Sequence, residues 1–388
     1  MSAITTPDGF VAAGVHVGLK ESGDPDLSFL GTEDGRAVSA AGVFTTNKLA
    51  AAPVQVSKAH LAATAGLASA VIVNSGNANA ATGPTGLAHA QDMCRLAAHE
   101  FRCQPEEVLV CSTGLIGIPL PFDLLESGIP KVVAARSRRG GGDAAVALLT
   151  TDTARKESLF SGSSFTVGGM AKGAAMLEPN MATMLAFITT DATLSPDLLQ
   201  PMLATAVGRS FNRLTVDGAQ STNDTVLALA SGAAGDADPA EIQAAFDSVC
   251  QDLALQMADD AEGSTKTVIV RVQGARSDEE AAVAARAVAN CQLVKCSWYG
   301  QSPYWGRVAA QVGASGVAFD PDLVSVAYGG VVTARNGVAA PHDEAAISRL
   351  YAERRIPITV DLGLGAGHAE IITTDLTHAY IDENMGKS

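Results

Sequence analysis

The sequence predicts an α/β fold built from layers of β-sheet and helix. Strand-like runs of β-branched and apolar residues alternate along the chain with longer amphipathic segments. Glycine is frequent, with 38 residues, whereas aromatic residues make up only 5% of the chain. Small side chains at this density suit layers whose backbones approach closely and are joined by tight turns.

The predicted strands and helices are read from local patterns. Predicted strands are short apolar runs at residues 70–73, 108–110, 267–272 and 358–362. Predicted helices cover residues 87–101, 196–210 and 239–257. In the third helix apolar residues recur mostly every three or four positions, and Ser195 suits the N-cap of the second. These patterns leave open whether neighbouring strands run parallel or antiparallel.

Length and composition indicate two lobes or one large, enzyme-sized unit. The 388 residues are 47% apolar, which is enough for a substantial core and excludes disorder of the whole chain. The net charge of −15 disfavours nucleic acid and anionic membranes as partners, because both are negatively charged. Neither a secretory signal nor a membrane span is visible. The six cysteines form no C-x-x-C pair, and we expect reduced thiols in a cytoplasmic protein.

Common catalytic and nucleotide-binding motifs are missing from the sequence. There is no G-x-S-x-G elbow, no H-E-x-x-H and no P-loop, and the seven histidines include no i, i+4 pair. Residues 363–367 are rich in glycine but precede strand-like residues, so we predict a hairpin turn there rather than a phosphate site. Residues 137–142 are predicted to form a flexible link. No metal and no cofactor is predicted.

The most unusual segment runs from residue 168 to residue 192. A glycine-rich turn carrying Lys172 leads through Pro179 to a short apolar strand that begins at Thr183. A threonine hydroxyl is a weak nucleophile, but a threonine at a chain terminus has its own α-amino group as a base. That amine titrates at about 7.7–8.0, so part of it is unprotonated near neutral pH. The structural alternative is that Thr183 only opens a strand, a position that threonine favours.

This segment resembles the glutamate N-acetyltransferase (ornithine acetyltransferase) family. The family pattern A-K-G-x-x-M-x-x-P-x-M-A-T-M-L runs here from Ala171 to Leu185. Other blocks that are similar to the family lie at residues 74–83, 111–117, 150–153, 210–218, 221–225 and 261–266. Members of the family are made as one chain that cuts itself before the threonine. The resemblance therefore implies cleavage between Ala182 and Thr183, giving an α chain of residues 1–182 and a β chain of residues 183–388.

The resemblance also implies roles for individual residues. Thr183 would be the nucleophile, with its freed amine as the base, and Thr113 and Gly114 would form the oxyanion hole. Residues that would bind substrate are Thr150, Lys172, Thr183, Glu262, Asn384 and Ser388. Ser388 matches the family pattern with its spacing off by one residue.

Several of these residues have a structural alternative. Lys172 could be an exposed turn residue, because lysines are usually exposed. Glu262 could be an acid at a helix end near Lys266. Thr113 and Gly114 could form only a tight turn.

The activity implied by the resemblance is transfer of an acetyl group from N-acetylornithine, or a similar N-acyl amino acid, to glutamate in arginine biosynthesis. An ester on Thr183 would carry the acetyl group, so no cofactor is required. The implied fold has mixed β-sheets sandwiched between helices, similar in layering to N-terminal-nucleophile hydrolases. The implied assembly is an α₂β₂ heterotetramer.

Two other functions stay open at this point. The chain departs from the family pattern at Ala219, Gln220, Ser302 and Tyr304. These changes motivate an amide hydrolase, or an acyltransferase with another substrate, that uses the same nucleophile. They fit a family member in specialised metabolism as well as one in arginine biosynthesis. A non-catalytic scaffold is the other alternative, and joint retention of the predicted site residues argues against it.

Overall fold

The computed structural model describes residues 2–178 and 184–385, and the chain divides into two compact units. Unit 1 comprises Met1–Asn212 and Ala219–Met257, and unit 2 comprises Arg213–Gly218 and Ala258–Ser388. The predicted division into residues 1–182 and 183–388 concerns a chain break and does not coincide with these units. It stays a prediction.

Unit 1 contains two mixed β-sheets. The first has the order β1-β2-β5-β6 and consists of β1 (Phe10–Val15), β2 (Leu27–Thr32), β5 (Ala70–Asn77) and β6 (Val108–Leu115). The second has the order β4-β3-β10-β9-β8-β7 and consists of β3 (Val38–Phe44), β4 (Leu67–Ala68), β7 (Lys156–Ser161), β8 (Thr166–Lys172), β9 (Leu185–Ala192) and β10 (Thr225–Gly235). The parallel pairs are β5 with β6 and β9 with β10, and the other neighbours are antiparallel.

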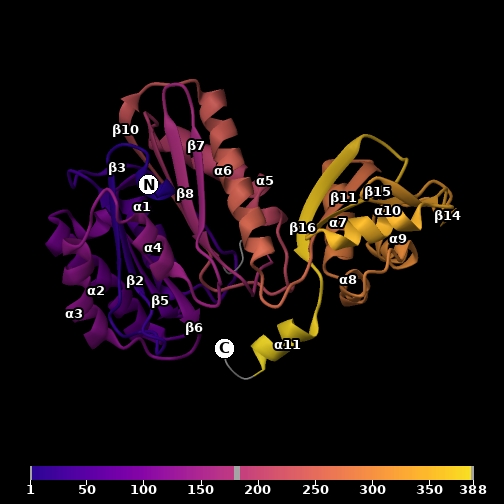
Figure 1. Cartoon of the computed structure of the whole chain (residues 1–388). Coiled ribbons are helices and arrows are strands. Elements are labelled where there is room, and N and C mark those ends of the chain that lie inside the picture. Colours follow the sequence, from indigo (N-terminus) through magenta and orange to yellow (C-terminus); the bar gives the residue numbers. More distant parts are fainter. Residues whose placement is uncertain (1, 179–183, 386–388) are drawn as a thin grey trace. The chain divides into compact units, whose positions relative to one another are not determined.

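Helices cover the outer faces of both sheets (Figure 1). On the four-stranded sheet these are α2 (Gly83–Phe101) and α3 (Phe122–Ala134), whereas α5 (Pro196–Arg209) and α6 (Pro239–Asp259) pack on the six-stranded sheet. Helix α4 (Gly141–Leu148) contributes to the core between the sheets. Helix α1 (Ala52–Ala63) packs beside the edge strand β6. The hydroxyl of Ser57 on this helix donates to the Val110 carbonyl of the strand at 2.7 Å. Short 3₁₀ helices cover Ala3–Thr5, Pro105–Glu107 and Phe211–Arg213.

In the four-stranded sheet of unit 1, alternation along the strands directs successive side chains into two different cores. On β5, Ile72 joins the core beneath the helices, while Val71 and Val73 join the core between the sheets. On β2, Phe29 and Leu30 divide in the same way. This period of two is what a strand with both faces buried requires. The predicted layering, with mixed sheets between helices, is confirmed.

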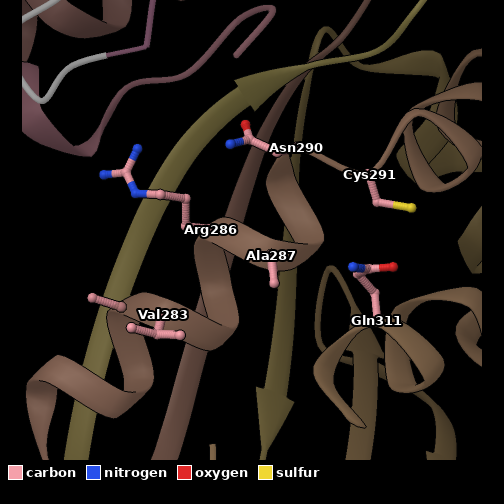
Figure 2. Close-up of a pocket in the computed structure, with 7 residues that line it drawn as sticks. Val283, Arg286, Ala287, Asn290, Cys291 and Gln311 are labelled. Carbon is pink, nitrogen blue, oxygen red and sulfur yellow. The ribbon is translucent and has the colours of Figure 1, made fainter. Parts of the chain in front are cut away.

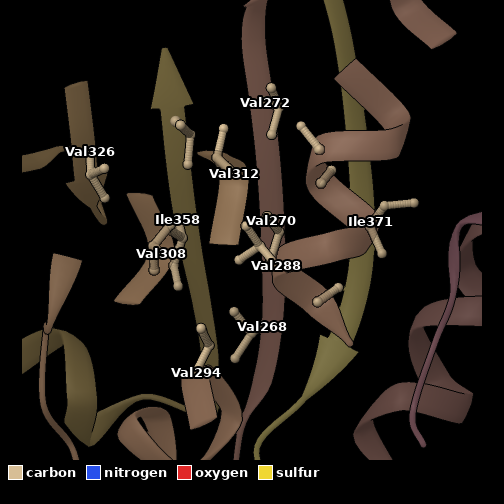
Figure 3. Packing of buried hydrophobic residues seen from close by; sticks show 14 of the residues in the cluster. Val268, Val270, Val272, Val288, Val294, Val308, Val312, Val326, Ile358 and Ile371 are labelled. Carbon is tan, nitrogen blue, oxygen red and sulfur yellow. The ribbon is translucent and has the colours of Figure 1, made fainter. Parts of the chain in front are cut away.

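Unit 2 is a six-stranded mixed sheet with its own helices. Its order is β14-β13-β12-β15-β11-β16, formed by β11 (Thr267–Ala275), β12 (Ser325–Tyr328), β13 (Val331–Arg335), β14 (Val338–Ala339), β15 (Arg355–Asp361) and β16 (Gly367–Thr374). The helices are α7 (Asp278–Ala289), α8 (Gln292–Tyr299), α9 (Trp305–Ala314), α10 (Glu344–Ala352) and α11 (His378–Asn384). Figure 3 shows this core, with Val270 of β11 beside Val288 and with Ile358 of β15 beside Val308.

The predicted strands and helices are confirmed, and two loop predictions are wrong. Residues 137–142 are not a flexible link, because Ser137 exchanges backbone hydrogen bonds with Ala12 and Gly141 begins α4. A Cβ on Gly140 would lie 1.9 Å from the Ala12 carbonyl oxygen, so this glycine permits a close approach. Residues 363–367 do not form a hairpin, because β15 and β16 both pair with β11, which lies between them.

Among the helices of the described residues, none combines the length and the apolar character needed to cross a membrane.

Candidate active site

Thr113 and Gly114 lie near the carboxyl end of β6, where its pairing with β5 becomes irregular. Gly76 pairs with Gly114, and the register shifts at the next residue. Gly114 has a φ of +133°, and a Cβ added to it would lie 2.3 Å from the Gly76 carbonyl carbon. Only glycine therefore fits this approach of two backbones. The two residues belong to a strand, so the alternative of a tight turn is wrong.

Lys172 is the last residue of β8 and is almost completely buried, with 3% of its surface exposed. Its ammonium group donates to Thr150 Oγ1 at 2.7 Å and to Thr113 Oγ1 at 3.4 Å. Asp152 Oδ2 lies 3.7 Å from the same nitrogen. The exposed-turn alternative for Lys172 is therefore wrong, and the structure brings together three of the predicted site residues.

Asp152 organises this cluster, although sequence reasoning gave it no role. Its carboxylate accepts from Lys156 Nζ at 2.7 Å, from the Gly173 amide at 2.6 Å and from the Thr150 amide at 3.2 Å. Burial alone would raise the pKa of Asp152, but the ammonium groups of Lys172 and Lys156 outweigh it and hold that pKa well below its usual range. The available signal was its position in the T-T-D-T block, directly after Thr150 and Thr151.

Three predicted residues, Ala182, Thr183 and Ser388, lie outside the described residues. The chain is described again from Met184, which precedes β9. The Met184 amide donates to Asp224 Oδ1 at 2.8 Å, and its carbonyl accepts from the Thr225 amide at 3.2 Å. Both backbone groups of the residue that follows Thr183 are therefore held by Asp224 and Thr225, the residue before β10 and the first residue of β10.

Asn223 and Asp224 form a buried polar pair before β10. The Asn223 side-chain amide donates to the Ala78 carbonyl at 2.6 Å and to the Ser112 carbonyl at 2.8 Å. Asp224 Oδ2 is buried and has no hydrogen-bond donor within the part of the chain that the structure describes. Burial raises the pKa of Asp224 well above its usual value, although the Met184 amide opposes that change. This pair ties the residue before Thr113 to the residue after Thr183.

Glu262 and Asn384 meet in unit 2. The Asn384 side-chain amide donates to Glu262 Oε2 at 2.8 Å. Glu262 is 8% exposed and lies beyond the end of α6, and Lys266 donates instead to the carbonyls of Tyr351 and Glu353. The alternative of a helix-end acid interacting with Lys266 is therefore not supported.

A small hollow of about 170 Å³ in unit 2 has Lys295, Asp217 and Tyr380 in its wall. Lys295 is buried and donates to the Val216 carbonyl at 2.7 Å and to Thr373 Oγ1 at 3.0 Å. Burial lowers the pKa of Lys295 to about 8, although Asp217 and a second carboxylate oppose the shift. The ammonium donors of Lys295 are used by the protein itself, which indicates a structural role.

A larger hollow of about 470 Å³ lies beside α7 in unit 2 (Figure 2). Arg286, Asn290, Cys291 and Gln311 contribute its polar atoms. None of the site residues predicted from the sequence motifs lines this hollow, so it is not part of the candidate site.

Comparison with known proteins gives one consistent result. The model of the ArgJ family matches residues 11–386. "Arginine biosynthesis bifunctional protein ArgJ" of Thermobifida fusca is 44% identical over 387 residues, which cover 100% of both chains. The protein of the same name from Mycolicibacterium paratuberculosis is 47% identical over 394 residues, covering 99% of this chain and 96% of that one.

A solved structure is also similar to part of the chain. The crystal structure of ornithine acetyltransferase from Mycobacterium tuberculosis, complexed with ornithine, matches with 42% identity and a TM-score of 0.44, covering 46% of this chain and 95% of that one. The resemblance read from the sequence is confirmed by the family model and by the full-length relatives. The chain belongs to the ArgJ family.

Proposed function

We propose that this chain is a glutamate N-acetyltransferase that takes its acetyl group from N-acetylornithine. Cleavage after Ala182 makes Thr183 a chain terminus. The Thr183 hydroxyl oxygen attacks the amide carbonyl carbon, and the α-amine of the same residue takes the hydroxyl proton. The C–N bond then breaks, ornithine leaves with that proton, and the acetyl group stays as an ester on Thr183.

Glutamate completes the reaction. Its α-amine attacks the ester carbonyl carbon, the ester C–O bond breaks, and the Thr183 oxygen regains a proton from the attacking amine. Thr113 and Gly114 stabilise the negative oxygen that forms in each half of the reaction. Losing one such donor costs about 2.7–4 kcal/mol in known enzymes. The ester retains the energy of the amide, so neither a cofactor nor a metal is needed.

The buried position of Lys172 is the observation that best supports this proposal. A desolvated ammonium group beside two threonine hydroxyls is suited to binding a carboxylate. Lys172 and Thr150 hold a substrate carboxylate. Glu262, Asn384 and Ser388 contribute further contacts to the ammonium and carboxylate groups of the amino acids.

The proposal extends to processing and assembly. The fragments 1–182 and 183–388 stay together in an α₂β₂ heterotetramer located in the cytoplasm. Mass spectrometry of the purified protein is expected to give both fragments. Thr183→Ala should give a single uncut chain without acetyl transfer, whereas Thr193→Ala, an exposed threonine just after β9, should be cut normally. A transferring Thr183→Ala protein would refute the assignment of the nucleophile.

A hydrolase with the same nucleophile is the second candidate, motivated by the departures from the family pattern, one of which, Ala219, contacts the segment before the cleavage point. The carbonyl of Ala219 accepts from the Glu178 amide at 3.0 Å, close in sequence to the cleavage point. Incubation with N-acetylornithine separates the two functions. Acetylglutamate formed only when glutamate is present supports transfer, and free acetate formed without glutamate supports hydrolysis.

A further inference from the structure

Lys20 lies on a loop that is built around a buried carboxylate. The backbone amides of Val17, Gly18, Leu19 and Lys20 all donate to Asp26, at 2.7, 3.0, 2.7 and 3.1 Å. Asp26 itself is completely buried. Four amides directed at one carboxylate hold this loop in a single conformation, which determines where the Lys20 side chain begins.

The Lys20 side chain lies against Gly76, on the strand that pairs with the predicted oxyanion hole. A Cβ added to Gly76 would lie 3.4 Å from Lys20 Cγ, so the lysine stem packs on this glycine. Gly76 is the strand partner of Gly114. Lys172 donates a hydrogen bond to Thr113, the residue before Gly114. One lysine thus contacts β6 itself, and the other contacts the residue of β5 that pairs with Gly114.

Lys20 retains hydrogen-bonding capacity. It is half-buried, and its ammonium group donates to the Pro25 carbonyl at 2.6 Å. It makes no ion pair with a carboxylate of the described residues. Burial lowers the pKa of Lys20 and the charge of Lys172 lowers it further, while Asp26 and Asp24 oppose the shift. An ammonium group has three donors, so two are left for a ligand.

Lys20 also lies close to a second, buried cationic group. The charge of Lys172, which is 3% exposed, acts on Lys20 and contributes to lowering its pKa. A ligand with two carboxylates would be stabilised by both lysines, because opposite charges attract strongly where water is excluded.

We propose that Lys20 binds the side-chain carboxylate of the acceptor amino acid and so makes the site selective for a dicarboxylate. This inference rests on the proposed function. N-acetylornithine has one carboxylate and a cationic side chain, whereas glutamate has two carboxylates. Lys172 serves the carboxylate that both substrates share. Lys20 serves the one that only glutamate has, and it acts mainly in the second half of the reaction.

The test compares glutamate with glutamine as acceptors, because glutamine lacks only the charge of the second carboxylate. We expect Lys20→Met to lower the ratio of kcat/KM for glutamate to kcat/KM for glutamine about 10- to 100-fold, the range for losing a hydrogen bond to a charged group. The kcat/KM for N-acetylornithine should change less than about twofold, because this parameter reports only the donor half of the reaction, which does not use Lys20. Lys131→Met, an exposed lysine on α3, is the matched control and should leave the ratio unchanged.

Each outcome separates this inference from the proposed function. If the wild-type protein forms no acetylglutamate from N-acetylornithine, the proposed function fails. If it does, but Lys20→Met lowers both acceptors equally or neither, Lys20 has a structural role or none, and the inference is wrong. If Lys20→Met does not fold, Lys20→Gln, which keeps a polar side chain, replaces it. The same ratio of kcat/KM for glutamate to kcat/KM for glutamine is then measured.

Discussion

Replacing Asp152 with asparagine would leave two buried ammonium groups without their shared carboxylate. Asp152 is 0% exposed, and the side chains of Lys156 and Lys172 that lie 2.7 and 3.7 Å from it are 1% and 4% exposed. Asparagine has nearly the same shape and can still accept the Gly173 amide, so the substitution removes charge rather than volume. Unpaired buried charges are costly because they have lost their hydration.

The expected loss of stability follows from the burial of these three side chains. Breaking a buried ion pair by removing one partner costs about 3–5 kcal/mol. We therefore expect Asp152→Asn to lower the free energy of unfolding of unit 1 by that amount at pH 7, measured by urea denaturation. The measurement is made in a Thr183→Ala background, so that chain cleavage does not differ between samples. Asp34→Asn breaks an exposed pair with Arg36 and should change stability by less than about 0.5 kcal/mol.

The pH dependence of the difference provides the decisive check. Because the pKa of Asp152 is lowered on folding, its contribution is complete above the unfolded value of about 3.9 and is lost as the pH falls towards the folded value. The difference in the free energy of unfolding between wild type and Asp152→Asn should have its full size at pH 6 and should shrink below about pH 4. Equal stability at pH 6, or a gap that persists in acid, would refute the reasoning.

Two other substitutions test separate features. Gly114→Ala would place a Cβ 2.3 Å from the Gly76 carbonyl carbon, so acetyl transfer should fall at least about 100-fold, whereas Gly208→Ala, with open space around its Cβ position, should keep the wild-type rate. Lys295 has its pKa lowered to about 8, so the unfolded chain binds more protons than the folded one between pH 8 and about 10.4. Wild-type stability due to this group should rise with pH across that range, and Lys295→Met should remove that part of the rise when urea denaturation is compared at pH 7.5 and 10.

Local sequence patterns predicted the positions of helices and strands well, but they did not predict which strands pair with one another. The predicted helix 239–257 is observed as Pro239–Asp259, because a spacing of three to four residues is a property of the segment itself. The turn at 363–367 was followed by a strand as predicted, but that strand pairs with β11 instead of β15. Pairing depends on residues about a hundred positions away, and no local pattern contains them. The close contact of Gly140 with Ala12 was missed for the same reason.

The same contrast between local patterns and contacts distant in sequence holds for the candidate site. Family motifs named Thr113, Thr150 and Lys172, and the structure joins them by hydrogen bonds. Asp152 was inside a recognised block, but its role depends on Lys156 and Lys172 both being buried around it. Lys20 lay in no recognised block. Its position depends on the loop around Asp26 and on the register of β5, which cannot be read from the residues next to it.

Lys20 and Lys172 are positioned by the same kind of arrangement, in which an aspartate accepts a backbone amide. Asp26 accepts the backbone amide of Lys20, and Asp152 accepts the amide of Gly173, directly after Lys172. Each acid thus binds the backbone of the segment that carries a lysine, and charge-assisted bonds of this kind are stronger than neutral ones. The backbone is held without consuming all the donors of the Lys20 ammonium group. Replacing Lys20 is consequently expected to change binding while its loop stays in place, whereas replacing Asp26 would release the loop and the lysine together.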